Sequence, residues 1–164
     1  MTMARVPQRN QQNDFCTGVY LNVGEDADYI TLKFGINDGH QHVPIGTLAD
    51  TDDTTYYGAW NRVMSWLISN RPYAKIGIIV SNGLDHNDYA EATIAIARKY
   101  GVPYLNEWSG EQVPMLIRSG RTDVDESVKE IRNAAFRVTE KNRHPNVACH
   151  KYESTFVESW LRTL

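Results

Sequence analysis

Asn37 has a residue type and a sequence position that suit chemistry at the end of a strand. It stands in the segment Gly35 to Asp38, which follows an apolar run. Glycine, asparagine and aspartate all favour a sharp turn. A side-chain amide fixed at a strand end can also donate a hydrogen bond to an oxygen atom that becomes negative during a reaction. The segment therefore predicts either a simple turn or an oxyanion-binding site.

His144 is the second residue that could take part in chemistry. Pro145 follows it and restricts its backbone to extended angles, so we expect the imidazole to project from a loop. A loop histidine ahead of a terminal helix can serve as a general base for a hydroxyl nucleophile. The alternative is a surface histidine without a role, whereas His150 is expected to cap or pack a helix.

Three short apolar segments rich in β-branched and aromatic residues predict buried parallel strands that would position these side chains. They span residues 29–35, 75–83 and 102–107, and residues 18–24 are a further strand candidate. Strand ends in such sheets are where ligands gather. Trp108 follows the third segment, where a sugar ring or an acyl chain could stack on it.

Helical patterns separate and follow these strands. Residues 54–70 predict a helix with one apolar face, formed by Tyr56, Trp60, Val63 and Leu67. Asp52, Asp53 and Thr54 are available to cap its start. Residues 85–101 end at Gly101, a good helix terminator. Residues 122–142 carry a Thr122 to Asp125 capping-box spacing and an apolar row comprising Val124, Val128, Ile131, Ala135 and Val138. The last helix, in residues 146–164, has its row at Tyr152, Phe156 and Trp160.

This alternation predicts an α/β fold, a three-layer α/β/α sandwich on a flavodoxin-like parallel sheet. With 164 residues we expect one domain over 1–164, in which 1–24 is polar and loosely ordered and 25–164 forms the α/β part. A sheet of this kind usually has about five strands, so we expect strands to be missing at the amino-terminal side.

Composition excludes several classes of function. The net charge of −3 gives no basis for nucleic-acid binding, because the only basic cluster, residues 140–145, is short and mixed. No apolar run predicts a membrane span and no secretion signal is evident, so we expect a soluble chain whose compartment is unspecified. Cys16 and Cys149 are expected to be free thiols. Neither metal-ligand spacing nor a glycine-rich phosphate loop is present, which predicts no metal and no cofactor.

Taken together, "GIND" after an apolar strand and "HPN" before the last helix resemble two blocks of the SGNH, or GDSL-type, hydrolases. The surrounding segments are similar to acylhydrolase-like members from Gram-positive bacteria and their phages; they include "DADYITLKFGIND", "PYAKIGIIVSNG" and "HPNVACHKYESTFVESWLRTL". The resemblance runs from about Asp26 to Leu164. It implies that Asn37 helps to form an oxyanion hole, that Gly35 lets the strand end approach substrate, and that His144 is the catalytic histidine. Asp38 is expected to brace the turn.

Departures from the family pattern are equally clear. The family's nucleophile is a serine in an amino-terminal Gly-Asp-Ser block, and this sequence contains no such block. The position three residues before the histidine, where the family has an aspartate, is Lys141. A lysine cannot stabilise an imidazolium as a carboxylate does. Two explanations fit: the chain is the carboxyl-terminal part of a longer hydrolase, or it is a complete protein that has lost hydrolysis.

The function that follows is serine ester hydrolysis of acyl or carbohydrate-acetyl esters, by a lipase-like or esterase-like enzyme whose nucleophile lies outside this sequence. The partner would be a small ester or an acylated carbohydrate. The alternative is a non-catalytic binding or structural module of a cell-surface or phage-tail assembly. A sheet short of strands also exposes an edge, so we expect self-association into a homo-oligomer.

Overall fold

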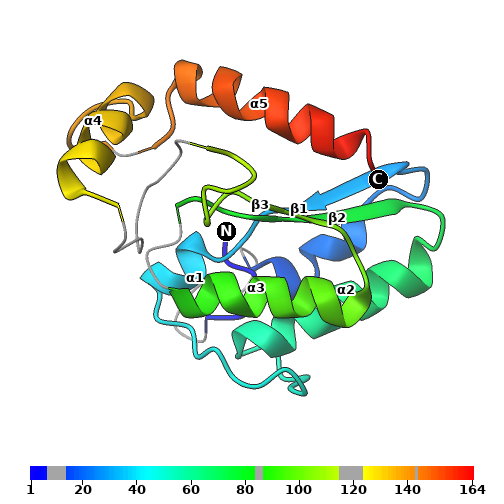
Figure 1. Cartoon of the computed structure of the whole chain (residues 1–164). Coiled ribbons are helices and arrows are strands. Elements are labelled where there is room, and N and C mark those ends of the chain that lie inside the picture. The colour runs from blue at the N-terminus through cyan, green and yellow to red at the C-terminus, as the bar shows by residue number, and fades with distance from the viewer. Residues whose placement is uncertain (7–13, 84–86, 115–123, 143) are drawn as a thin grey trace.

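The structure is a computed structural model that describes residues 1–6, 14–83, 87–114, 124–142 and 144–164 (Figure 1). At its centre is an open parallel sheet with the strand order β1-β2-β3. The strands are β1 (Tyr29–Leu32), β2 (Lys75–Val80) and β3 (Tyr104–Asn106). All three lie within the predicted segments, because short β-branched runs suit strands buried on both faces. The predicted α/β fold is confirmed.

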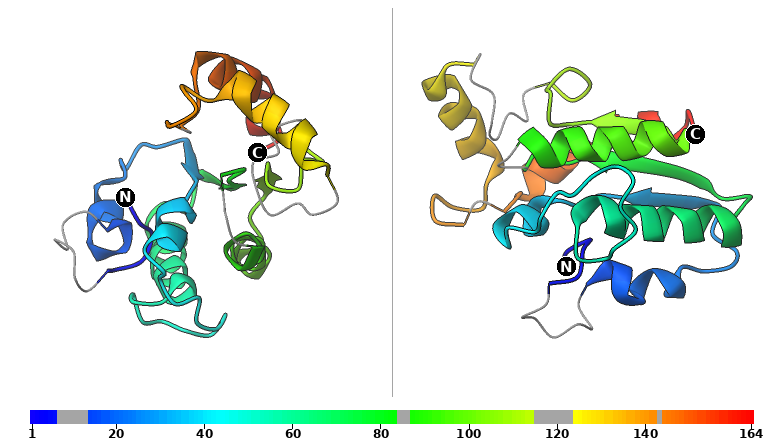
Figure 2. Two further views of the ribbon diagram at one scale, coloured as in Figure 1. Left: turned by 90° about the vertical axis from the view of Figure 1, so that its left-hand side faces the viewer. Right: turned by 90° about the horizontal axis from the view of Figure 1, so that it is seen from below.

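Helices cover both faces of this sheet. α2 (Tyr56–Asn70) and α3 (Asn87–Tyr100) lie side by side on one face, and α5 (Val147–Leu161) crosses the other, as Figures 1 and 2 show. Two shorter helices, α1 (Ile36–His40) and α4 (Glu126–Phe136), lie toward the carboxyl ends of the strands. The order of layers is therefore helix, sheet, helix.

The side chains of β2 point alternately to the two faces of the sheet, and the hydrophobic core has a separate cluster on each face. Ile76, Ile78 and Val80 belong to the larger cluster, which includes the fully buried Trp60 of α2. Ile79 belongs to a smaller cluster packed against α5, whose members include Leu105, Val113, Cys149, Phe156 and Trp160. Cys16 and Cys149 are buried, form no disulfide with each other and lie in different clusters. Successive side chains of a buried strand thus hold helices on opposite faces.

The predicted face of α2 is confirmed, because Tyr56, Trp60, Val63 and Leu67 are all fully buried. Its cap differs from the expected residues: the Thr55 side chain accepts a hydrogen bond from the Gly58 N–H at 3.1 Å. Asp53 is instead engaged by Arg5 at 2.7 Å, so it is used for tertiary contact. α3 ends as predicted, with Gly101 at a φ of +64°.

Residues 18–24 do not form a strand, which corrects the fourth strand candidate. The 3-10 helix η3 (Val19–Asn22) occupies this segment, after η2 (Phe15–Thr17). The Leu21 N–H donates to the Gly18 carbonyl at 3.1 Å, so local bonds satisfy the backbone. Gly18 has a φ of +135°, a conformation that glycine adopts without strain. Tight local turns therefore replace sheet pairing here.

α4 begins later than the capping-box spacing predicts. Its cap is Asp125, whose side chain accepts from the Ser127 N–H at 2.8 Å, whereas Thr122 lies outside the described residues. The apolar row is not a buried face: Val128 is 44% exposed and Ile131 is 71% exposed. Two members of the predicted row, Val124 and Val138, lie outside α4, so the expected apolar face is wrong.

The amino-terminal residues are partly buried. Thr2, Met3 and Ala4 have no exposed surface, while residues 7–13 lie outside the described part of the chain. None of the helices in the described residues has both the length and the apolar character needed to cross a bilayer.

Candidate functional site

Asn37 and His144 line the same cavity, a hollow of about 630 Å³ that we call the site cavity. The residues around it come from the ends of β1 and β2, from α1 and α4, and from the loop before α5. Figure 2, left, views the molecule from the side where α1 and α4 lie. Residues 107 positions apart in the sequence are thus brought to the carboxyl end of one sheet, where ligands of parallel sheets gather.

Gly35 sets the direction of Asn37. Its φ of +117° lies in the region that favours glycine, and it provides the turn between β1 and α1. The Asn37 amide donates to the carbonyl oxygen of Met1 at 3.0 Å. An amide carries two N–H groups, so one of them remains for a second acceptor.

Asp38 braces the same turn, as the sequence predicts. Its buried carboxylate accepts from the backbone N–H groups of Met3 at 3.0 Å and Ala4 at 2.9 Å. Burial raises the pKa of Asp38, and the two backbone hydrogen bonds oppose that rise. The first residues of the chain are thereby seated beside Asn37.

His144 projects from a tight loop between α4 and α5. Its carbonyl accepts from the Val138 N–H at 3.0 Å, and its own N–H donates to the Asn142 side chain at 3.2 Å. His144 is exposed, in agreement with the loop position expected from Pro145. The loop is closed by hydrogen bonds at its base, which restricts the backbone that carries the imidazole.

Asn146 ties this loop to both neighbouring helices, a role that the sequence reasoning missed. Its amide nitrogen donates to the carbonyls of Ala135 and Arg137, each at 3.0 Å. Its amide oxygen caps α5 by accepting from the Cys149 N–H at 2.9 Å. The signal was an asparagine directly before a helical pattern, the usual cap position.

The carboxylate that would support His144 is not at position 141. Lys141 is exposed and lines the site cavity. Among the described residues that line the site cavity, Glu130 is the one carboxylate, and Arg137 binds its oxygen at 2.7 Å. Among the described residues, no side chain forms a hydrogen bond or ion pair with the His144 imidazole.

A buried charge cluster lies next to the site cavity and was also missed. It consists of Lys33 after β1, Glu107 after β3 and Glu153 on α5, and we call it the Lys33 cluster. The Lys33 ammonium lies 2.7 Å from Glu107 and also binds Glu153. Its side chain is 35% exposed and lines the site cavity, whereas Glu107 is fully buried. Burial and a proton shared with Glu153 raise the pKa of Glu107 to about 8, although Lys33 opposes the shift.

Two further side chains near the strand ends, Trp108 and Ser81, do not extend the site. Trp108 is half-buried and packs against the larger core cluster, and it is not among the described residues that line the site cavity. Ser81 does line it, but the residue is 1% exposed and its oxygen accepts from the Gly83 N–H at 3.3 Å, as in an ordinary turn. In the described part of the chain no three His, Cys, Asp or Glu side chains gather as a metal site would require.

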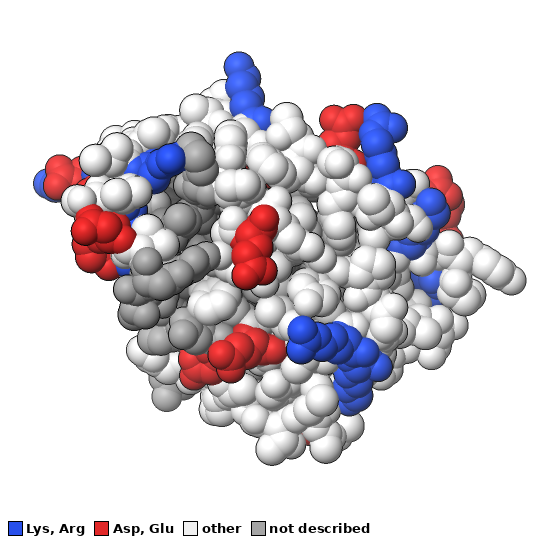
Figure 3. Space-filling view, in the orientation of Figure 1, with Lys and Arg blue, Asp and Glu red and all other residues white. Residues whose placement is uncertain are grey.

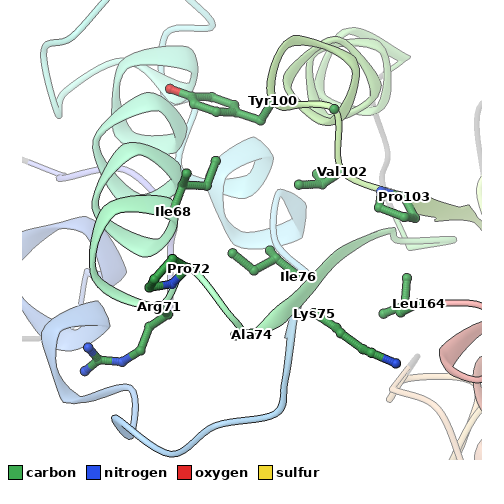
Figure 4. A pocket seen from close by; sticks show the side chains of 11 residues that line it. Ile68, Arg71, Pro72, Ala74, Lys75, Ile76, Tyr100, Val102, Pro103 and Leu164 are labelled. Carbon is green, nitrogen blue, oxygen red and sulfur yellow. The ribbon is translucent and has the colours of Figure 1, made fainter.

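A second hollow, of about 370 Å³, lies at the opposite end of β2. Figure 4 shows Ile68, Tyr100 and Leu164 around it. The Arg71 guanidinium there donates to the Gly24 carbonyl at 2.8 Å. This cation therefore has a structural role, because it links the end of α2 to the segment before β1. Chemistry-bearing side chains instead concentrate in the site cavity.

Several solved structures have a fold similar to that of this chain. No family model and no curated protein matches the chain. A crystal structure of a protein from Lactobacillus plantarum is 26% identical, with a TM-score of 0.72 over 98% of this chain and 77% of that one. Two structures described as "putative GDSL-like lipase" also match. The one from Bacteroides ovatus ATCC 8483 is 16% identical, with a TM-score of 0.69 over 99% of this chain and 68% of that one.

The second of these, from Bacteroides uniformis ATCC 8492, is 18% identical, with a TM-score of 0.68 over 99% of this chain and 66% of that one. At this level of identity the likeness concerns the fold. The chain therefore shares its fold with structures described as GDSL-like lipases, in agreement with the fold that the sequence resemblance implies.

Proposed function

We propose that this protein is the SGNH-type part of a serine ester hydrolase acting on short acyl esters. The observation that supports the proposal most directly is the shared site cavity of Asn37 and His144. In this reaction a serine hydroxyl attacks the ester carbonyl while His144 takes its proton. His144 then returns the proton to the leaving alcohol, and water releases the acyl group by the reverse sequence.

Asn37 has the role of oxyanion donor in this proposal. Its amide is fixed by the Gly35 turn and by the contact with the Met1 carbonyl at 3.0 Å. One N–H is free to point toward the oxygen that becomes negative. Loss of one such donor typically slows the reaction about 10²–10³-fold.

The serine is proposed to come from a segment outside this sequence. Met1 is held at Asn37, so a residue joined to the Met1 amino group starts beside the proposed oxyanion donor. This placement agrees with the family resemblance, in which the serine block precedes the corresponding segment. A serine joined to the Met1 amino group can therefore be used to test whether the nucleophile comes from that side of the site cavity.

The test compares three forms of the protein with p-nitrophenyl acetate as substrate. These are the 164-residue chain, a form with a strand and Gly-Asp-Ser directly before Met1, and a matched form ending in Gly-Asp-Ala. Only the serine form should show turnover. In that form His144→Ala should abolish the activity, whereas the matched change His150→Ala, at an exposed position of α5, should leave it intact.

Two results would contradict the proposal. One is equal activity of the serine and alanine forms, which would show that another group is the nucleophile. The other is an inactive serine form that folds normally by circular dichroism, as expected of a non-catalytic binding module. Covalent labelling by a fluorophosphonate probe separates these cases, because it requires an activated serine but no particular ester.

A further inference from the structure

The side chains that line the site cavity are mostly hydrogen-bonding groups. Four amides face it, from Asn37, Asn82, Asn133 and Asn142. Among the described residues that line it, Ile36 and Pro145 are the only ones with larger, wholly apolar side chains. Sites for apolar ligands are lined mainly by hydrophobic and aromatic groups. A long acyl chain would therefore find little apolar surface here, whereas the hydroxyl groups of a sugar would find both donors and acceptors.

The cavity is also positively charged in a protein that is negatively charged overall. Its described lining contains three cations, Lys33, Arg137 and Lys141, against one carboxylate, Glu130. The whole chain has a net charge of −3, and the face shown in Figure 3 carries basic and acidic side chains interspersed. The excess of positive charge is thus a local property of the site cavity.

Two of the three cations are already neutralised by protein groups. Lys33 binds the carboxylates of Glu107 and Glu153 behind it, and Arg137 binds Glu130 at 2.7 Å. Lys141 has no ion-pair partner among the described residues, and it is exposed. It stands three positions before His144, on the same tight loop. A ligand that reaches His144 therefore meets one unneutralised ammonium group.

We propose that the site cavity binds esters of a hydroxylated, negatively charged compound, of the uronic acid type, and that Lys141 pairs with its anionic group. The amides bind the hydroxyl groups, and the carboxylate lies against Lys141. This inference rests on the proposed function for naming the ligand an ester, but binding of the anionic alcohol part is independent of hydrolysis. It also gives the lysine at this position a role in specificity.

The experiment measures binding to the 164-residue chain by ¹⁵N–¹H NMR titration with galactose, galacturonate and galactose 6-phosphate. Galactose and galacturonate share their ring and differ in the charged group. At least one anionic ligand should bind about fivefold more tightly than galactose, the factor expected of one solvent-exposed ion pair. The stronger of the two identifies the preferred anion, and added salt should reduce the preference.

Variants assign this preference to one residue. Lys141→Met should remove it, and Lys141→Glu should reverse it in favour of galactose. Lys151→Met is the matched control, because Lys151 is an exposed lysine on α5 outside the cavity lining, and it should preserve the preference. The proposal is overturned if none of the three ligands binds, if galactose binds as tightly as both anions, or if Lys151→Met has the same effect as Lys141→Met. Inactivity of the serine-extended form would refute hydrolysis and leave these binding results unchanged.

Discussion

Glu107 is the residue whose environment departs most from that of an ordinary carboxyl group. It is fully buried and faces Lys33, which follows β1, and Glu153 of α5; the His150 Nδ1 atom lies 3.9 Å from Glu153. Burial raises its pKa from 4.5 to about 8. For Lys33, burial acts to lower the pKa, but the two carboxylates outweigh it and the pKa is raised. The folded protein therefore favours the protonated form of Glu107, while the pKa of Glu153 is lowered, which favours its charged form.

This environment predicts that the free energy of unfolding falls as the pH rises from 4.5 to about 8. Over that range the unfolded chain has lost the Glu107 proton while the folded chain keeps it, so deprotonation favours unfolding. Urea unfolding midpoints measured from about pH 5 to about pH 9 should decline accordingly. Glu107→Gln should flatten this dependence. The exposed Glu111→Gln is the control, and an unchanged slope in Glu107→Gln would show that the proton is held elsewhere.

Some residues of the candidate site could be predicted from local sequence patterns, whereas the contacts of the Lys33 cluster could not. Asn37 and His144 could be selected as candidates because Gly35 permits a sharp turn just before Asn37, and because Pro145 restricts the backbone of His144. The pairing of Lys33 with Glu153 spans 120 positions and has no local pattern. Lys33 and Glu107 meet only because strands that flank β2 end at the same edge, so their contact follows from the sheet register and not from the sequence.

At the scale of elements, Gly77 in β2 determines how closely α5 approaches the sheet. A Cβ atom at this position would lie 2.5 Å from the Trp160 ring, closer than atoms can pack. We predict that Gly77→Ala lowers the free energy of unfolding by about 1–3 kcal/mol, the usual cost of overpacking. In the background of Trp160→Phe, which removes the contacting ring, the same change should cost less. Chemical denaturation of the four proteins measures this coupling, and simple additivity would contradict the contact.

Element positions were largely predictable, and the exceptions have physical causes. The three strands and the buried face of α2 followed from periodicity, since burial on one or both faces leaves a direct sequence pattern. Residues 18–24 have a strand-like composition, yet local hydrogen bonds satisfy their backbone in η3. α4 has a clear apolar row, but Ile131 is 71% exposed because amphipathic spacing does not say what an apolar face packs against.

At the scale of the whole molecule, the open sheet leaves β1 as an edge strand in the described structure. Tyr29 and Thr31 on this strand are exposed, and an unprotected edge can pair with another chain. We predict concentration-dependent self-association in multi-angle light scattering. Thr31→Lys should weaken it because a charge blocks edge pairing, whereas Ser154→Lys, at an exposed position of α5, should not. A monomer at all concentrations would contradict pairing through this edge.

The division of the core into two clusters has a consequence for the site cavity as a whole. Asn37 is anchored through Ile36 and the Asp38 turn to the larger cluster, while His144 is anchored through Phe136 and Cys149 to the smaller one. The two halves of the proposed machinery are therefore anchored in different clusters. If α5 and its cluster opened locally, the imidazole would move away from Asn37 and the proposed chemistry would stop, even with the larger cluster intact.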